Sequence, residues 1–331
     1  MRLPYPFPIR RRKSSRGSCF EFTFTTAFAK GHSNRVRICV IFNPTAKGDK
    51  ARNFQKQLGE FGGEADLRAT THAGAAREMA KAAVEDGFDI VVAAGGDGTL
   101  NEIVNGIADA ENGFERCKFG VIPLGTVNVF ALELGISFGL EQAWDLIRRG
   151  KERRIDLPQA AFRVGDKTVT RKFLQLAGAG WDARAIELVS WTLKKRIGRF
   201  AYVWAGLRAL KEAKSKVVAR VGNEVFEGDF ALIGNGKFYA GKYPFLHKAD
   251  LGDGLLDLTM FPNFRLRSLP GNLTNFVLGK YFRAGTQAYL QAREIELISE
   301  TVTPLQLDGD LVGHLPAKIS LLPKVLRVIV P

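Results

Sequence analysis

The chain has 331 residues, 46% of them hydrophobic, which is enough for two domains whose cores need neither disulfide bonds nor metals. Its three cysteines are widely separated, its four histidines are scattered, and no segment approaches eighteen uncharged apolar residues. These features argue against a disulfide framework, a zinc site and a membrane-spanning helix.

The net charge of +14 is concentrated near the N-terminus, where residues 1–37 hold nine Lys or Arg against one Glu. No long apolar stretch and no convincing cleavage site follow the basic run Arg10–Lys13, so this region does not resemble a signal peptide. We expect residues 1–35 to be a solvated, disordered basic tail. The alternative is a polybasic contact to anionic lipid or nucleic acid.

From residue 36 to about residue 155, predicted strands and helices alternate. Strands are predicted at VRICVIF (36–42), EADLRAT (64–70), DIVVAA (89–94) and KFGVIP (118–123). Helices are predicted at 51–61, 75–87, 99–108 and, as two short helices, within 127–149. Short connections of this kind predict a parallel sheet with right-handed crossovers and ligands at the carboxyl ends of its strands.

After RRGKERRIDLP (148–158) the pattern changes to strand pairs joined by tight turns. Hairpins are predicted around Gly165–Asp166 and Gly222–Asn223. They indicate a second, mostly antiparallel β domain over residues 156–316, interrupted by helices near 183–216 and 268–280. The α/β domain then spans residues 36–155, and the last strands, 317–331, could belong to either domain.

Two glycine patterns are weak nucleotide motifs. GAGWDA (178–183) fits a dinucleotide fingerprint, but no acidic residue lies about 20 positions further on to bind a ribose. GKFYAGKY (236–243) matches a phosphate loop except at Tyr243, where Ser or Thr would hold Mg²⁺. We expect neither segment to bind a nucleotide.

GGDGT (95–99) has a better context, because it joins a predicted strand to a predicted helix. Its glycines allow the backbone amides to approach a phosphate closely. Asp97 would repel that phosphate unless a cation lies between them, and Mg²⁺ bridges carboxylate and phosphate oxygens. The alternative is that Asp97 or Thr99 only caps the helix.

Six segments in order resemble one family: NPTAKG (43–48), GGDGTLNE (95–102), PLGTVNVFALELGI (123–136), GAGWDA, GDGLLDL (252–258) and LDGD (307–310). The chain resembles the diacylglycerol kinase catalytic domain, which bacterial lipid kinases share with sphingosine and ceramide kinases. The resemblance covers nearly the whole chain from about residue 36. GGDGT alone is less specific, since NAD kinases carry it too.

The resemblance implies an NAD kinase/diacylglycerol kinase-like fold, with a parallel-sheet α/β domain, a mainly antiparallel β-sandwich, and ATP in the cleft between them. It implies a Mg²⁺ site at Asp250, Asp253 and the Leu255 carbonyl, connected through water to Asp97, and a general base at Asp308. On its residues alone, Asp308 is better interpreted as a simple hairpin-turn residue. The implied nucleotide-lining residues are Asn43, Pro44, Thr45, Lys47, Thr70, Gly95, Gly96, Asp97, Gly98, Thr99, Asn101 and Thr126.

The sequence departs from the family pattern at four of these places. Lys47 stands where Gly is frequent, and a lysine there could reach a phosphate. Val129 replaces a frequent Asp, and Asp310 stands where Glu is common. Gly252 replaces the first member of a frequent Asp-Asp pair, which makes the metal site the least secure assignment.

The resulting hypothesis is an ATP- and Mg²⁺-dependent lipid kinase that transfers the γ-phosphate to the hydroxyl of a neutral lipid, with diacylglycerol favoured. The alternatives are another lipid alcohol (a sphingoid base, undecaprenol or ceramide), an NAD kinase, and a non-catalytic binder of anionic lipid or nucleic acid. A lipid kinase is expected in the cytoplasm, peripheral at the inner face of the cytoplasmic membrane, with no nucleic-acid partner. The basic and aromatic segment 191–216 and RRGKERR (148–154) are candidate membrane contacts. The alternative for the segment 191–216 is a soluble helix that packs its aromatic residues into the core. The oligomeric state stays open, a homodimer included.

Overall fold

The computed structural model describes residues 36–44, 52–54, 56–57, 63–136, 139–188, 216–239, 241, 243–262 and 288–331. Several predicted features lie outside these residues: the basic tail, Thr45, Lys47, the helix near 268–280 and most of the segment 191–216. Within the part of the chain that is described, no helix is long and apolar enough to cross a membrane.

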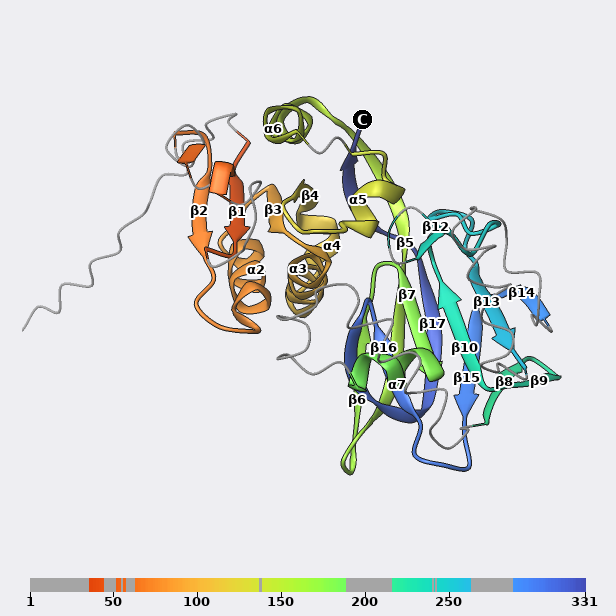
Figure 1. Cartoon of the computed structure of the whole chain (residues 1–331). Coiled ribbons are helices and arrows are strands. Elements are labelled where there is room, and N and C mark those ends of the chain that lie inside the picture. The colour runs from red at the N-terminus through yellow and green to blue at the C-terminus, as the bar shows by residue number, and fades with distance from the viewer. Residues whose placement is uncertain are drawn as a thin grey trace, which may run out of the picture. The chain divides into compact units, whose positions relative to one another are not determined.

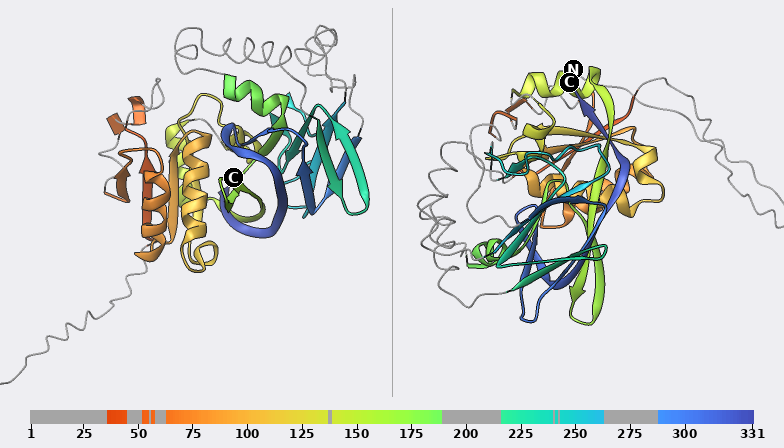
Figure 2. Two further views of the ribbon diagram at one scale, coloured as in Figure 1. Left: turned by 90° about the horizontal axis from the view of Figure 1, so that it is seen from below. Right: turned by 90° about the vertical axis from the view of Figure 1, so that its right-hand side faces the viewer.

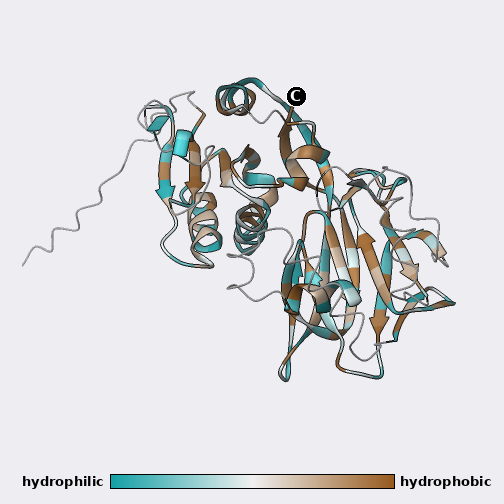
Figure 3. Ribbon diagram, viewed as in Figure 1, coloured by the Kyte–Doolittle hydropathy of each residue, from teal (hydrophilic) through white to brown (hydrophobic). Residues whose placement is uncertain are grey.

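The first part of the fold is a parallel sheet in the order β4-β3-β1-β2. Its strands are β1 (Ile38–Phe42), β2 (Asp66–Ala69), β3 (Ile90–Gly95) and β4 (Lys118–Pro123). Every residue of β1 and β3 is buried, whereas the edge strand β2 is partly exposed and carries hydrophilic residues (Figure 3). The predicted parallel α/β arrangement is therefore confirmed.

Helices cover both faces of this sheet. They are α2 (Ala75–Glu85), α3 (Asp97–Asp109), α4 (Gly113–Arg116), α5 (Val129–Glu133) and α6 (Leu140–Arg149). Side chains alternate along a strand, so Cys39 and Ile41 of β1 pack with α2 and α3, which lie side by side (Figures 1 and 2). Ile38 and Val40 point the other way and pack with Trp144 of α6.

The second part is mostly antiparallel, and its first and last strands along the chain are the two longest among the described residues. These are β5 (Lys151–Val164) and β17 (Asp310–Val330), which pair along most of β5. The shorter elements are β6 (Lys167–Lys172), β7 (Leu176–Gly180), α7 (Trp181–Leu188), β8 (Val217–Val221), β9 (Glu224–Gly228), β10 (Phe230–Gly234), β11 (Phe238–Tyr239), β12 (Tyr243–Pro244), β13 (Leu256–Phe261), β14 (Ala288–Ala292), β15 (Glu294–Ile298) and β16 (Pro304–Leu307).

Both predicted hairpins are present. β5 pairs with β6 and β8 pairs with β9, each antiparallel. Gly165 and Gly222 in their turns have φ of 60° and 57°, a left-handed conformation that glycine adopts without strain. Most of the other strands continue one sheet in the order β14-β13-β10-β7-β16-β17.

β17 connects the two parts, because it pairs with strands of both. Its first residues pair with β16, whereas Val328 near its end pairs with Phe119 of β4 in parallel register. The register against β5 shifts between Leu322 and Leu326, and Lys324 there has a φ of 52°. The parallel and antiparallel strands therefore form one continuous sheet.

The stretch RRGKERR is engaged in ion pairs. Arg148 pairs with Glu64 and Asp145 at 3.4 and 2.6 Å. Arg153 and Arg154 pair with Asp250 and Glu115 at 3.2 and 2.9 Å. The contact of this stretch with a membrane stays a prediction, and these arginines keep 37–45% of their side chains exposed.

Candidate active site

The predicted nucleotide residues that the structure describes follow the carboxyl ends of four adjacent strands (Figure 1). Asn43 and Pro44 follow β1, Thr70 follows β2, and Thr126 lies in the loop after β4. The strand ends are level, since Phe42 pairs with both Ala69 and Ala94. The structure therefore brings these residues to one edge of the sheet.

The glycine loop lies at the centre of this edge. β3 ends at Gly95, and α3 begins at Asp97 with Gly96 as its N-cap. A Cβ on Gly125 would lie 2.6 Å from the Cα of Gly96, so the loops after β3 and β4 touch through their backbones. Gly98 is exposed, with open space above it. The first amides of α3 are thus accessible to an anion, as a phosphate-binding loop requires.

Asp97 joins this loop to the next one. Its carboxylate accepts hydrogen bonds from the backbone amides of Val129 and Phe130, at 3.2 and 3.3 Å. Gly96 occupies the N-cap position of α3, so neither Asp97 nor Thr99 is its N-cap residue. Burial raises the pKa of Asp97, and the amides of α5 act against this by stabilising the ionised form. The negative charge in the loop is thus offset by the N-terminus of α5.

Asp308 lies in the turn between β16 and β17, with a φ of 49°. Its carboxylate points inward and accepts four hydrogen bonds. The donors are Leu174 N, Gln175 N and Leu176 N, at 2.7, 2.9 and 3.0 Å, and Asn101 Nδ2 at 2.8 Å. Burial raises the pKa of Asp308, whereas these donors favour its ionised form. Asp308 is in a hairpin turn, as its residues alone indicated, and its carboxylate is engaged by donors from β7, the residues before it and α3.

The predicted metal residues lie in the turn before β13. Asp250 Oδ1 accepts hydrogen bonds from Gly252 N and Arg153 Nη2, at 2.9 and 3.2 Å. Asp253 Oδ1 accepts one from Leu255 N at 2.9 Å. Burial raises the pKa of Asp253, and the negative charges of Asp250 and Asp156 raise it further. A cation at this turn would relieve the repulsion between these carboxylates.

The donor types at this turn fit Mg²⁺. Among the described residues, no three His, Cys, Asp or Glu side chains form a group that could hold a metal. A cation here would therefore bind two carboxylates, the Leu255 carbonyl and water, and Mg²⁺ commonly keeps several waters. Arg153 competes for Asp250, so Asp253 is the stronger of the two carboxylate candidates.

Sequence reasoning missed Asp156, which organises the metal turn. Asp156 is fully buried in β5, and its two carboxylate oxygens accept hydrogen bonds from Gly254 N and Lys324 N, both at 2.7 Å. It thereby ties the turn to the irregular point of β17. An aspartate within the apolar run Ile155–Leu157 was the available clue, because a buried charge needs fixed partners.

Neither weak glycine motif forms a nucleotide loop. In GAGWDA, Gly178 is a β7 residue, and a Cβ there would lie 2.3 Å from Oδ2 of Asp182. Asp182 is itself buried, bonded to the Tyr239 hydroxyl and to Gln306 Nε2. The described part of GKFYAGKY forms the short pair β11–β12.

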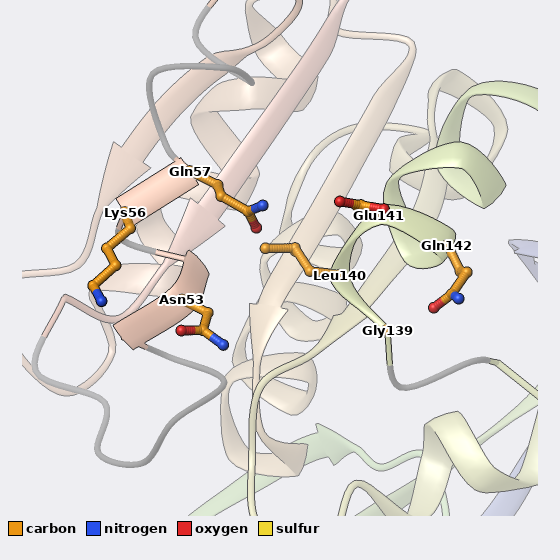
Figure 4. Close-up of a pocket in the computed structure, with 7 residues that line it drawn as sticks. All are labelled: Asn53, Lys56, Gln57, Gly139, Leu140, Glu141 and Gln142. Atoms are coloured by element: carbon orange, nitrogen blue, oxygen red, sulfur yellow. The ribbon is translucent and has the colours of Figure 1, made fainter.

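A pocket of about 350 Å³ lies at the start of α6 (Figure 4). No predicted site residue lines it. Its lining residues are Asn53, Lys56, Gln57, Gly139, Leu140, Glu141 and Gln142.

A glycine-rich loop at the strand ends of a parallel sheet, with an inward-facing carboxylate on an adjoining antiparallel part, defines a class of two-part phosphotransferases. Residues 37–160 match the model of the diacylglycerol kinase catalytic domain. Residues 175–330 match the YegS C-terminal NAD kinase beta sandwich-like domain.

Individual relatives agree with these matches. A diacylglycerol kinase of Staphylococcus saprophyticus is 31% identical over 304 residues, covering 90% of this chain and 96% of the relative. One of Staphylococcus aureus is 33% identical over 309 residues, covering 90% and 93%. The chain therefore belongs to the diacylglycerol kinase family and is a lipid kinase.

Solved structures support the fold. A putative diacylglycerol kinase from Bacillus anthracis has a TM-score of 0.71 at 24% identity, covering 89% of this chain and 98% of that one. Yeast NADH kinase complexed with NADH has a TM-score of 0.50 at 10% identity, with 89% and 83% covered. The NAD kinase/diacylglycerol kinase-like fold is thus confirmed.

Proposed function

We propose that the protein transfers the γ-phosphate of ATP, with Mg²⁺, to the hydroxyl of a neutral lipid, with diacylglycerol as the favoured acceptor. The main supporting observation is that α3 connects the glycine loop to Asp308. The helix begins in the glycine loop, and one turn later Asn101 donates a hydrogen bond to Asp308. A phosphate-binding element and a candidate base are therefore joined by one helix.

Phosphoryl transfer depends mainly on positioning and on neutralising charge. The amides at Gly95–Thr99 would hold the phosphates, and Asp97 would keep the neighbouring loop in place through α5. As the bond from the acceptor oxygen to the γ-phosphorus forms and the bond to ADP breaks, Asp308 would accept the hydroxyl proton. Mg²⁺, held by Asp250, Asp253 and the Leu255 carbonyl, would supply positive charge.

The protein would act at the inner face of the cytoplasmic membrane, because its acceptor is a membrane lipid. We place residues 36–155, with the end of β17, in the nucleotide domain and residues 156–316 in the domain that holds Asp308. β17 supports this division by pairing with both β4 and β16.

The test supplies labelled ATP with a panel of diacylglycerol, ceramide, a sphingoid base, undecaprenol and NAD. We expect phosphorylated diacylglycerol as the main product. Asp308→Asn should lower kcat by about 10²- to 10⁴-fold, because general-base catalysis contributes that much, while nucleotide binding persists. No lipid product from the wild type in any detergent would refute the proposal, and NADP formation would favour an NAD kinase. Full activity of Asp308→Asn would remove the base assignment alone.

A further inference from the structure

Two asparagines on α3, one turn apart, attach this helix to the end of β6. Asn101 and Asn105 are 1% and 3% exposed, and both donate to the Lys172 carbonyl, at 3.1 and 2.9 Å. Asn105 also accepts a hydrogen bond from Lys172 N at 3.0 Å. Asn105 thus pairs with the Lys172 backbone much as a neighbouring strand would.

Asn101 differs from Asn105 in its side-chain partners, since it hydrogen-bonds to Asp308 Oδ2 and to Arg171. The orientation of its amide is determined by its neighbours. Its Oδ1 accepts hydrogen bonds from Arg171 Nε and Nη2, at 3.2 and 3.0 Å, and a further one from Asn105 Nδ2 at 3.2 Å, so that Arg171 still orients the amide when Asn105 is removed. Turning the amide over would place its NH₂ against the guanidinium and its oxygen against a carboxylate. Arg171 therefore holds Asn101 with its donor towards Asp308.

We infer that Asn101 is a positioning residue for Asp308 rather than a nucleotide ligand. The inference rests on the proposed function and assigns a different role from the one the sequence indicated. The side chain of Asn101 is engaged in the contact between α3 and β6, where its partners are Lys172, Arg171 and Asp308.

The four donors on Asp308 explain why this contact matters for the reaction. A carboxylate has about four lone-pair positions, and backbone amides of residues 174–176 hold three of them. Asn101 is the side-chain donor among the described residues, so its hydrogen bond is the one that a substitution can remove without altering the backbone. Losing the Asn101 donor also removes stabilisation of the ionised carboxylate, which raises the pKa of Asp308.

The charged side chains that the described elements bring towards this turn are few. Arg171 of β6 bonds to Asn101 and, at 3.3 Å, to Asp310 of β17. Asp182 of α7 reaches the turn through Gln306, which accepts a hydrogen bond from Gly309 N. Burial lowers the pKa of the neighbouring Lys172, whose charge interacts with Asp109. α3 itself contributes the neutral amide of Asn101.

The test compares Asn101→Ala with Asn105→Ala, since both remove a buried amide from the same contact. For lipid phosphorylation, we expect Asn101→Ala to move the acidic limb of kcat/KM upward by about one pH unit. Its KM for ATP should change less than about twofold, because the residue touches no nucleotide in this inference. Asn105→Ala should leave the pH profile in place. An Asn101→Ala profile that matches Asn105→Ala, or a raised KM for ATP without a pH shift, would overturn the inference.

Two further measurements keep the test informative if Asn101→Ala does not fold or if the protein shows no lipid phosphorylation. Asn101→Asp keeps the side-chain shape and replaces the donor by a second carboxylate. It should therefore move the acidic limb of the kcat/KM profile to a still higher pH. The pKa of Asp308 can also be followed without turnover, by a ¹³C-carboxyl NMR titration of aspartate-labelled protein assigned with Asp308→Asn. An upward shift in the Asn101 variants supports the inference even if no lipid is phosphorylated, and an unchanged pKa refutes it. Wild-type inactivity by itself counts only against the proposed function.

Discussion

Asp97 shows how a carboxylate can occupy a loop built for anions. It is the first residue of α3, and it accepts hydrogen bonds from the first amides of α5. Partial positive charge from two helix N-termini therefore surrounds it. The cation that the sequence indicated beside this loop stays a prediction, and the structure supplies backbone amides from residues more than thirty positions away. Local spacing cannot reveal such a partner.

Removal of the Asp97 side chain should therefore destabilise the fold as well as the loop. Asp97→Ala leaves the amides of Val129 and Phe130 without their acceptor, at an expected cost of about 1–3 kcal/mol in the free energy of unfolding. Asp97→Asn retains one acceptor oxygen and should lose less. Urea denaturation measures both, and the KM for ATP should rise in the same order.

Thr99→Ala is the control for this prediction, because Thr99 lies in the same first turn of α3 and does not cap it. Its unfolding free energy should stay within about 0.5 kcal/mol of the wild type. If Asp97→Ala were as stable as Thr99→Ala, the hydrogen bonds to α5 would not hold the loop.

The sequence predicted where strands and turns occur better than it predicted which strands pair with each other. Alternation of strands and helices predicted β1–β4, and glycine turns predicted the hairpins β5–β6 and β8–β9. Neither pattern could place residues 317–331, because an apolar strand fits any buried sheet. The answer came from pairing: Val328 of β17 lies beside Phe119 of β4.

A charged cluster fastens β17 to β4 and β5. Glu152 accepts hydrogen bonds from Arg327 Nε and Nη2, both at 2.9 Å, and pairs with Lys118 at 3.4 Å. The hydrogen bonds from Arg327, followed by its charge and by Lys118, lower the pKa of Glu152 from 4.5 to about 2. A lowered folded-state pKa adds stability that is fully present above the unfolded pKa and is lost as pH falls through the folded value.

Glu152→Gln should therefore weaken the fold in a pH-dependent way. Because the cluster is partly exposed and therefore screened by solvent, we expect a loss of at most about 1 kcal/mol at pH 7. The difference from the wild type should shrink below the unfolded pKa of 4.5 and approach zero near pH 2. Urea denaturation at pH 7, 4 and 2.5 measures it. A difference that stayed constant over this range would mean that the charge of Glu152 contributes nothing.

Across the whole molecule, the sequence identified the residues that share one edge of the sheet. It did not reveal which side chains make contacts between the parallel and the antiparallel part. Asn43, Thr70 and Thr126 are recognisable because each follows a strand, and parallel strands end at the same edge. The direction of Asn101 depends on Arg171 and Lys172, which lie about seventy residues away. Asp156 similarly acts on Gly254 and Lys324, far from it in sequence.

Asp156 makes the metal turn part of the global fold, because it fastens the turn to β17 at the point where that strand passes between the parts. A cation bound at Asp253 should therefore raise the free energy of unfolding of the whole fold, rather than stabilise this turn alone. A ligand that binds only the folded state adds about 2.7 kcal/mol at a hundred times its Kd. We expect Mg²⁺ to raise the midpoint of thermal unfolding and EDTA to reverse the rise.

Asp253→Asn should abolish this Mg²⁺-dependent rise, since it removes the carboxylate that is not paired with an arginine. Asp166→Asn is the matched control, because Asp166 is an exposed aspartate in the β5–β6 turn, and it should respond to Mg²⁺ as the wild type does. Scanning calorimetry without nucleotide separates this site from metal carried by ATP. An Asp253→Asn variant that keeps the full Mg²⁺ effect would place the cation elsewhere, and the link from the turn through Asp156 to β17 would then carry no metal dependence.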